Sequence, residues 1–396
     1  MTTNAPAPFP PFTPEHELFR KTVRDFAVKE LAPHTEEWER DELFPNWVFK
    51  RAGELGIFGA HYPEDVGGAG GDYWYSIAKS EELIHCGMAG VGMGLLVQSD
   101  MATPCINELG TAEQKKEFLE PALRGEKIAA LGVSEPGAGS DVAGLRTTAR
   151  SEGGDYVING SKTYITNGTR ADFVTLLVKT NPEAGHHGIS IILFPTDTKG
   201  FGVSKKLSKM GNWSSDTAEL FFDNCRVPKR YLLGQEGMGF IYLMQNFQSE
   251  RLIAASSAVA GSQHALDRSL EWGRSRTAFG KPLIKREVWQ HKLAELYTKV
   301  EAARSLTYRA AHAFNTDRYI RKGDISFETT KMIAMAKLFV GEEMSIVADQ
   351  VVQFHGGMGY LEDLWVARYY RDHRLLRIGG GTSEVMKYMI AKISGW

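Results

Sequence analysis

Two changes in the spacing of apolar residues divide this chain of 396 residues into three parts. Apolar residues recur at helical spacing up to about residue 123, and short strand-like runs bounded by Gly, Asn, Asp and Pro follow. Helical spacing returns from Gly239. Because few helical segments interrupt the strands, a doubly wound sheet is excluded. We expect an α+β multidomain fold with an N-terminal α-helical domain (1–125), a middle β domain (126–235) and a C-terminal α-helical bundle (236–396).

Local signals place the first helix and a hairpin. Thr13-Pro14-Glu15 combines a capping residue, a proline suited to the first helical position and an acid in the first turn, so a helix is predicted to begin there. In the β block, Asn159-Gly160 lies between two strand-like runs, 156–158 and 162–166. Because Asn-Gly suits the left-handed torsions of a two-residue turn, we predict a hairpin that turns at these two residues.

Composition excludes several classes of protein. The 46 Lys and Arg nearly balance the 48 Asp and Glu, so a strongly basic nucleic-acid binder is excluded. Three widely spaced cysteines give no disulfide or zinc framework, and the histidines form no ligand cluster, so we expect no metal. No apolar run approaches the roughly 20 residues needed to span a bilayer. The Pro-rich N-terminus, 1–12, is unlike a secretory signal or transit peptide. We therefore expect a cytoplasmic protein with no membrane insertion.

One glycine-rich segment has the composition of a ligand-binding loop. It reads Val133-Ser134-Glu135-Pro136-Gly137-Ala138-Gly139-Ser140-Asp141. Its glycines allow close approach of the backbone to a ligand, and its hydroxyls can donate hydrogen bonds to a ring or phosphate, although a plain surface turn has the same composition. Further along, Tyr164 and Thr166 are two apart on a predicted strand, so both side chains are expected on one face, where they could meet one flat ligand.

These segments resemble the acyl-CoA dehydrogenase family. The resemblance runs in order through nearly the whole chain: Val133–Asp141, Tyr164–Gly168, Lys209–Gly211, Ser215–Thr217, Arg226–Pro228, Arg276–Lys281 and Val352–Gly357. It implies the three-domain fold predicted above, with FAD as the cofactor. By this resemblance, Ser134 and Thr166 would bind the isoalloxazine, Tyr164 would pack against it, and Ser140 would contact the pyrophosphate region.

The resemblance also implies an assembly of several subunits. Arg276, Phe279, Gln353 and Gly357 resemble positions that hold the adenosine diphosphate half of a neighbouring subunit's FAD. An arginine suits a pyrophosphate because its planar fork donates two parallel hydrogen bonds. Taken alone, Arg276 would be read as a solvated charge at a helix end. With the resemblance, we expect a homo-oligomer, most simply a tetramer.

The position of the catalytic base sets this chain apart within the family. Many members carry the base in a Tyr-Glu-Gly-Thr sequence, but here the residues are Gly379-Gly380-Gly381-Thr382. The long-chain and isovaleryl-CoA types carry it in a Glu-Arg-Leu sequence, which this chain matches with Glu250-Arg251-Leu252. We therefore predict Glu250 as the base, although a glutamate at a helix start usually just complements the helix dipole. Arg251 and Gly380 would line the substrate site, and Thr382 would touch the flavin.

The resemblance implies a reaction and its partners. A carboxylate base would take the α-proton of an acyl-CoA thioester while the β-hydrogen leaves as hydride to the flavin. Electrons would then pass to an electron-transfer flavoprotein. The missing side chains at 379 and 380 favour a branched or bulky acyl group, although glycines also simply permit a tight turn. The alternatives are a flavin oxidase or flavin-dependent monooxygenase on the same fold, and a non-catalytic flavin-fold scaffold.

Overall fold

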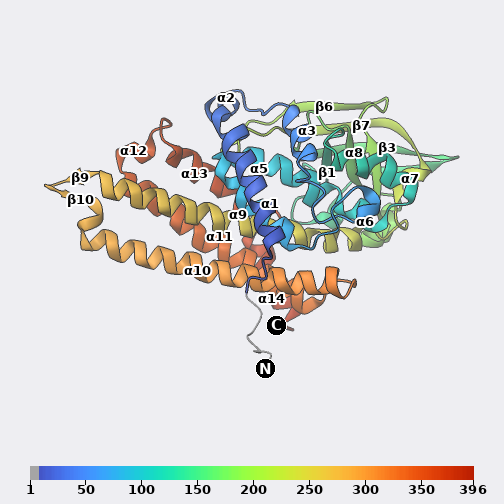
Figure 1. Ribbon diagram of the computed structural model, residues 1–396. Coiled ribbons are helices and arrows are strands. Elements are labelled where there is room, and N and C mark those ends of the chain that lie inside the picture. The colour runs from blue at the N-terminus through green and yellow to red at the C-terminus, as the bar shows by residue number, and fades with distance from the viewer. Residues whose placement is uncertain (1–8) are drawn as a thin grey trace.

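The structure, a computed structural model, describes residues 9–396. The first eight residues of the Pro-rich N-terminal segment therefore lie outside the described residues. Figure 1 shows a sheet domain on the right, a bundle of long helices that projects to the left, α1 and α5 between the two, and α6, α7 and α8 on the side of the sheet. This order confirms the predicted succession of helices, a β block and helices. The domain boundaries at 125 and 235 stay predictions.

Within residues 9–128, the regular secondary structure of the N-terminal region is all helical. Thr13 caps its first helix, because the hydroxyl oxygen accepts a hydrogen bond from the backbone N–H of His16, with Pro14 at the first helical position. This start is where the sequence predicted it. The α-helices are α1 (Pro14–Asp25), α2 (Thr35–Arg40), α3 (Trp47–Glu54), α4 (Trp74–Glu82), α5 (Ala89–Leu96), α6 (Pro104–Leu109), α7 (Ala112–Gln114) and α8 (Glu120–Leu123), with a π-helical turn, η5 (Val97–Ala102), after α5.

The middle region is one mostly antiparallel sheet. Its path runs β6-β7-β3-β2-β4-β5-β8, and β1 pairs with β4 in parallel. Apolar residues of β4 and β5 are buried along nearly their whole length, which makes these strands the centre of the core. The strands are β1 (Ala129–Gly132), β2 (Thr148–Glu152), β3 (Asp155–Thr166), β4 (Phe173–Lys179), β5 (Ile189–Pro195), β6 (Phe201–Lys206), β7 (Thr217–Pro228) and β8 (Leu232–Leu233).

The predicted hairpin turn at Asn159-Gly160 is wrong. Both residues lie inside β3, which continues past them to Thr166. The turn between β2 and β3 falls instead at Gly153-Gly154, because Glu152 pairs with Asp155. Gly160 has a φ of +149°, and a Cβ there would lie 2.7 Å from Cα of Thr147. The glycine therefore allows a shift of register between β3 and β7 and a close approach of the β3 backbone to Thr147.

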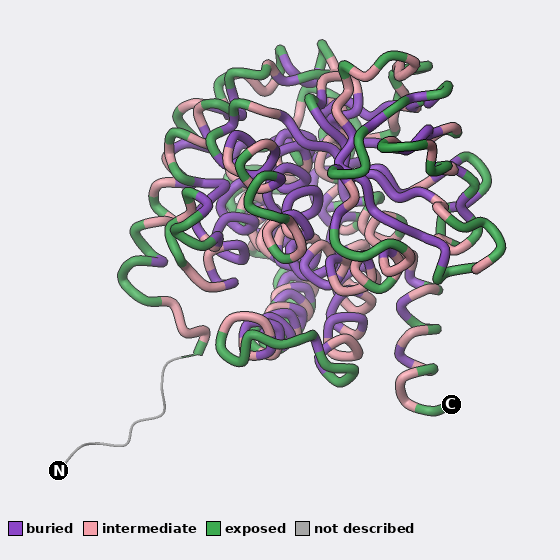
Figure 2. The backbone as a smooth tube through the Cα atoms, turned by 90° about the vertical axis from the view of Figure 1, so that its right-hand side faces the viewer, coloured by how far each residue is buried: buried purple, intermediate pink, exposed green. Residues whose placement is uncertain are grey.

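The C-terminal region is built on three long helices and a shorter one. They are α9 (Gly239–Ser275), α10 (Glu287–Asn315), α11 (Phe327–His355) and α14 (Ser383–Ile393). A small hairpin of β9 (Thr277–Ala278) and β10 (Lys281–Pro282) joins α9 to α10 at the far left of Figure 1, near α12 (Gly357–Tyr360), and α13 (Trp365–His373) follows. Figure 2 shows the inward faces of the long helices buried. The α10 stripe of Leu293, Leu296, Val300 and Ala303 forms part of that core.

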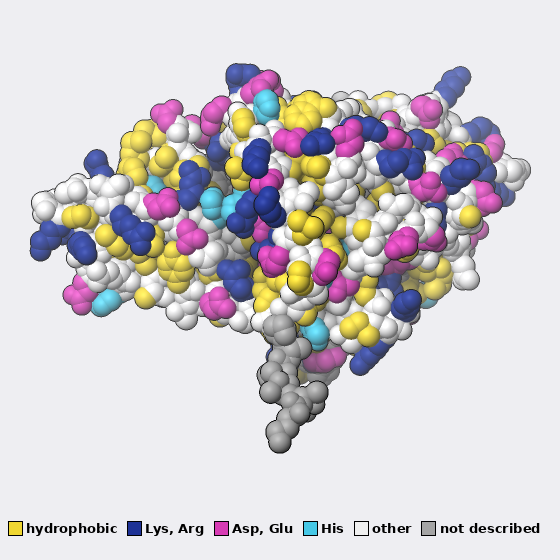
Figure 3. Space-filling model, viewed as in Figure 1, with side chains coloured by type: hydrophobic (Ala, Val, Ile, Leu, Met, Phe, Trp, Pro, Cys, Tyr) yellow, Lys and Arg dark blue, Asp and Glu magenta, His cyan; other side chains and the backbone are white. Residues whose placement is uncertain are grey.

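The surface shows no single sign of charge. On the face in Figure 3, acidic and basic side chains are intermixed over the sheet domain and the bundle. Within residues 9–396, no helix combines the length and the apolar character needed to cross a bilayer.

Candidate active site

Glu250 lies in the interior of α9 and not at a helix start. The helix begins at Gly239, about three turns before Glu250. The alternative interpretation of Glu250 as a charge at a helix start therefore does not apply, and α9 begins at Gly239, where the sequence predicted that helical spacing returns. Since the field of a helix dipole fades beyond the first turn, neither capping nor the dipole accounts for a carboxylate at this position.

The Glu250 carboxylate has no partner in the part of the chain that the structure describes. The residue is half-buried, and within residues 9–396 no hydrogen bond or ion pair reaches its oxygens. Burial raises the pKa of this carboxyl above its usual range, and the charges of Arg251 and Lys337 act in the opposite direction. A carboxyl group with a raised pKa and free oxygens is suited to accept a proton from a bound molecule.

A glycine loop faces this carboxylate. A Cβ on Gly380 would lie 3.3 Å from Oε1 of Glu250, and Gly380 has a φ of +66°. Gly381, with a φ of +97°, also needs the left-handed region. A residue with a side chain at 380 would have a strained backbone, and its Cβ alone would already crowd the Glu250 carboxylate. A side chain at 380 and the Glu250 carboxylate would therefore compete for the same space.

Two buried cations hold the glycine loop. Arg251 is 3% exposed, and its Nε donates a 3.1 Å hydrogen bond to the carbonyl of Gly380. Lys337, on α11, donates from Nζ to the carbonyl of Gly381. Burial lowers the pKa of Arg251 to about 10 and that of Lys337 to about 8. Arg251 was predicted at this site, whereas Lys337 was not. Its position among the buried apolar residues of α11 is a signal that could have identified it.

Thr382 directly follows the loop and has a structural task. Its hydroxyl oxygen accepts a hydrogen bond from the backbone N–H of Val385 at 3.3 Å, which caps α14. A hydroxyl that accepts through its oxygen still has a proton to donate. The predicted contact between Thr382 and a flavin stays a prediction.

The glycine-rich loop of the middle region lies against the end of β3. The carbonyl of Ser134 accepts a 2.9 Å hydrogen bond from the backbone N–H of Thr163, so the loop and the strand share one edge. Beneath them, Nζ of Lys162 lies 2.8 Å from Oε1 of Glu135 and 3.0 Å from the carbonyl of Val133. Both side chains are buried, and this pair anchors the loop. Neither Glu135 nor Lys162 was assigned this anchoring role from sequence.

The exposed side of this edge carries an aromatic ring and hydroxyls. Tyr164 is 71% exposed and has a φ of +62°, at a shift of register between Lys162 and Ile165. The regular strand alternation assumed for Tyr164 and Thr166 is therefore interrupted, although neither side chain is buried. Ser140 is exposed on the same loop as Ser134. A large exposed ring beside free hydroxyls fits the flat, polar-edged ring system of a flavin.

The residues predicted for a neighbouring subunit's FAD meet at the other end of the bundle. Arg276, Gln353 and Gly357 line one hollow of about 520 Å³, between the ends of α9 and α11. Phe279 lies outside the lining of this hollow, at the tip of the β9–β10 hairpin, and is 94% exposed. Within residues 9–396, no hydrogen bond or ion pair joins this group to the Glu250 loop or to the Ser134–Thr166 edge.

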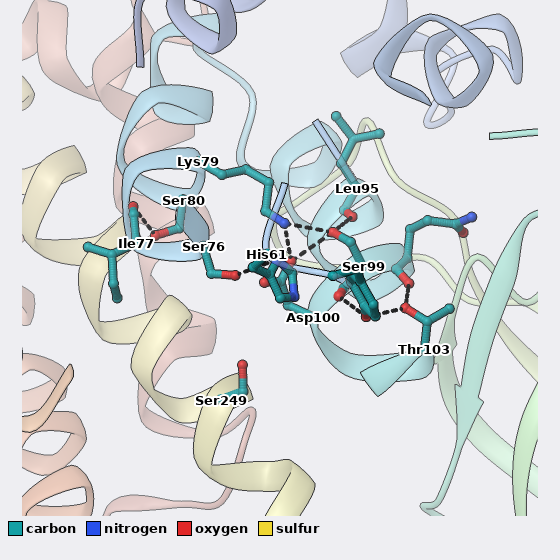
Figure 4. A network of polar contacts seen from close by, with 12 residues as sticks. His61, Ser76, Ile77, Lys79, Ser80, Leu95, Ser99, Asp100, Thr103 and Ser249 are labelled. Atoms are coloured by element: carbon teal, nitrogen blue, oxygen red, sulfur yellow. Dashed lines mark hydrogen bonds and ion pairs between the residues drawn. The ribbon is translucent and has the colours of Figure 1, made fainter. Parts of the chain in front are cut away.

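A buried polar network joins α4 to the η5 turn, beside the α9 helix (Figure 4). Lys79 and Asp100 form a fully buried ion pair, with Nζ 2.7 Å from Oδ2, and Ser99 donates to the same carboxylate. On the same side of α9, the hydroxyl of Tyr73 donates a 3.1 Å hydrogen bond to the carbonyl of Ser249. This bond fixes the turn of α9 that carries Glu250, and the sequence reasoning missed it because the partners are far apart in the chain.

Comparison with known proteins places the chain in a family. Models of the acyl-CoA dehydrogenase N-terminal, middle and C-terminal domains match residues 13–126, 130–225 and 237–394. The long-chain specific acyl-CoA dehydrogenase of Rattus norvegicus is 39% identical over 383 residues, which cover 96% of this chain and 86% of that protein. The short-chain specific enzyme of Mus musculus is 40% identical over 377 residues, covering 95% and 89%.

A solved structure agrees with these matches. The crystal structure of an acyl-CoA dehydrogenase from Geobacillus kaustophilus superposes with a TM-score of 0.90 at 37% identity, over 97% of this chain and 99% of that one. Because long-chain and short-chain specific relatives are similar to the same degree, overall identity does not select an acyl chain. The chain belongs to the acyl-CoA dehydrogenase family, flavoprotein oxidoreductases that dehydrogenate acyl-CoA thioesters.

Proposed function

We propose that the protein catalyses FAD-dependent α,β-dehydrogenation of an acyl-CoA, with Glu250 as the base that removes the α-proton. The observation that carries this proposal is the half-buried Glu250 carboxylate, which lacks a hydrogen-bond or ion-pair partner within residues 9–396. Burial raises its pKa, which brings its basicity closer to that of the developing enolate. Gly380, which lies beside Oε1, carries no side chain that would crowd the carboxylate.

The cofactor would be held by residues of two subunits. Ser134, Ser140, Tyr164, Thr166 and Thr382 would bind the flavin half of one FAD. Arg276, Phe279, Gln353 and Gly357 of a neighbouring subunit would bind its adenosine diphosphate half, which makes a homo-oligomer, most simply a tetramer, part of the proposal. The hollow beside Arg276 supports the second set, and the exposed Tyr164 ring supports the first. When bound, FAD supplies the acceptor for the β-hydrogen.

The chain itself supplies the base and its surroundings. Glu250 must be ionised before substrate arrives and must hold the α-proton at its carboxyl oxygen afterwards. Arg251 and Lys337 keep the loop at 380–381 in place against α9, so the carboxylate faces a rigid wall on that side. Bound substrate would exclude water from the pocket, which further raises the basicity of the carboxylate.

We further propose that the acyl group is branched or bulky. A Cβ on Gly379 would make only ordinary contacts with Leu375, at 3.5 Å or more, so the backbone there could carry a side chain, and its absence leaves that volume to the acyl group. Comparing kcat/KM for straight and branched acyl-CoA thioesters tests this, and a clear preference for butyryl-CoA contradicts it. The proposed electron acceptor is an electron-transfer flavoprotein, and a cytoplasmic location stays part of this proposal. Hydrogen peroxide release during turnover would instead favour a flavin oxidase.

Substitution of Glu250 tests the proposed base directly. In Glu250→Gln, we expect bound flavin to be retained while acyl-CoA reduces it about 10³-fold more slowly, because an amide cannot take the proton. The measurement is anaerobic titration with a panel of acyl-CoA thioesters, followed by loss of flavin absorbance. Glu384→Gln is the matched control, since Glu384 is an exposed carboxylate close to the same loop. Unchanged reduction in Glu250→Gln would show that the base lies elsewhere.

A further inference from the structure

Lys337 is a buried lysine without a carboxylate partner in the part of the chain that the structure describes. It is 1% exposed and lies on α11 among buried apolar residues such as Ile333 and Val340. Its only hydrogen bond within residues 9–396 is to the carbonyl of Gly381, a neutral group. Burying an ammonium group without a counter-ion is costly, so its retention needs a reason beyond packing.

The other fully buried lysines show what a structural lysine looks like in this protein. Lys79 lies 2.7 Å from Asp100, and Lys162 lies 2.8 Å from Glu135, so each is neutralised by an adjacent carboxylate. Lys337 differs, because the carboxylate that feels its charge is Glu250, to which it makes no ion pair. A neutral amide could donate the bond to Gly381 equally well. What lysine adds at this position is its positive charge.

We propose that Lys337 is a positioning residue for the dehydrogenation, which holds the Gly380–Gly381 loop against α9 and keeps the Glu250 carboxylate ionised in the substrate-free enzyme. This inference rests on the proposed role of Glu250 as the base. Burial pushes that carboxyl toward its neutral form, and a base that is already protonated cannot accept a second proton. A cation close to the carboxylate but not bonded to it opposes protonation and leaves both oxygens free.

The other groups packed around Glu250 do not replace this charge. Arg251, on α9 itself, is the second cation that lowers the pKa of Glu250, and its Nε is occupied by the carbonyl of Gly380. The loop that faces Glu250 consists of glycines. From the N-terminal region, Tyr73 contributes a neutral hydroxyl, which donates to the carbonyl of Ser249. Lys337 is therefore the one charge that α11 brings to the carboxylate.

The pH dependence of kcat/KM for a turned-over acyl-CoA tests the proposal. Lys337→Met removes one of the two positive charges that lower the pKa of Glu250, so this pKa should rise. We therefore expect the acidic limb of the profile to move about one pH unit upward. At pH values below the limb, kcat/KM then falls about tenfold. Near pH 9 it approaches wild type, because Lys337, with a pKa of about 8, has lost its charge in the wild type as well.

Matched variants separate charge from structure. Lys337→Arg should restore the acidic limb, and Lys331→Met, the same substitution at a lysine of α11 that pairs with Glu328, should leave it unchanged. If Lys337→Met does not fold with bound flavin, the comparison of Lys337→Arg with Lys337→Gln carries the same test. An equal loss of kcat/KM at every pH, or an unmoved limb, overturns the proposal. Full activity of Glu250→Gln would instead overturn the assignment of the base.

Discussion

The protein buries a lysine near a glutamate in two regions, with opposite outcomes. In the middle region, Lys162 pairs with Glu135, which also accepts hydrogen bonds from the backbone N–H groups of Arg146 and Thr147. Although burial opposes it, this pairing holds the pKa of Glu135 below its usual range. In the C-terminal region, Lys337 bonds to a carbonyl, Glu250 accepts no bond within residues 9–396, and burial raises the pKa of Glu250.

The difference lies in the hydrogen bonds and not in the residue types. A carboxylate that accepts three hydrogen bonds is locked in its ionised form and serves to hold a loop. A cation that is near a carboxylate but not bonded to it favours the ionised form and leaves the oxygen lone pairs free to accept a proton. The first arrangement is suited to structure and the second to proton transfer.

The largest predicted effect is on stability, from the same substitution at both lysines. Lys162→Met should lower the free energy of unfolding by about 3–5 kcal/mol, because it leaves the buried Glu135 carboxylate without its cation. Lys337→Met should change it by less than about 1 kcal/mol, because the ion it removes has no bonded counter-ion. Urea denaturation of the flavin-loaded proteins compares them. Equal losses would mean that the Lys337 charge is a structural partner of Glu250.

A smaller effect separates the two carboxylates by pH. The pKa of Glu250 is higher in the folded state than the value of 4.5 in the unfolded chain. The folded state therefore binds this proton more tightly, and the stabilisation that results is present below pH 4.5 and is lost as pH rises through the raised pKa. Glu250→Gln should therefore gain stability relative to wild type as pH rises from 4.5 through the raised pKa. Thermal unfolding across that range measures it. A gain that shrinks as pH rises would contradict the unpaired state of Glu250.

For Glu135 the sign is reversed. Its pKa is lowered in the folded state, so its contribution is present above 4.5 and is lost as pH falls through the lowered value. Glu135→Gln should therefore be destabilised relative to wild type at neutral pH and less so in acid. This variant serves as the control for the Glu250 series.

The smallest effect concerns the loop that faces Glu250. Gly380→Ala should cost about 1 kcal/mol of stability, because its φ of +66° is strained for alanine, and should also slow turnover, since its Cβ would lie 3.3 Å from Oε1 of Glu250. Gly379→Ala is the matched control for stability, because φ there is not in the left-handed region and the nearest contacts are at 3.5 Å. Equal losses of stability in the two variants would show that the left-handed φ at 380 does not strain an alanine.

Much of the fold and part of the site could be predicted from the sequence. The change from helical to alternating apolar spacing identified the order of helices, sheet and helices, and the Thr13-Pro14 signal identified the first helix. The Asn159-Gly160 prediction failed because a close approach to Thr147 and a shift of register against β7 outweighed a local turn preference. The return of helical spacing at Gly239 identified the start of α9, and Glu250 lies about three turns inside this helix.

The sequence by itself determined the family and the order of the helical and β regions, and it predicted Glu250 in place of residue 380 as the base. These depend on residue types and on periodicities that are local in the chain. Only the tertiary structure decided which buried charges are paired. Lys162 meets Glu135 across 27 residues, whereas Lys337 reaches a loop 44 residues away, beside a carboxylate to which it does not bond. Hydrogen-bond partners are selected by three-dimensional packing, and that selection separates a carboxylate that holds a loop from one that can take a proton.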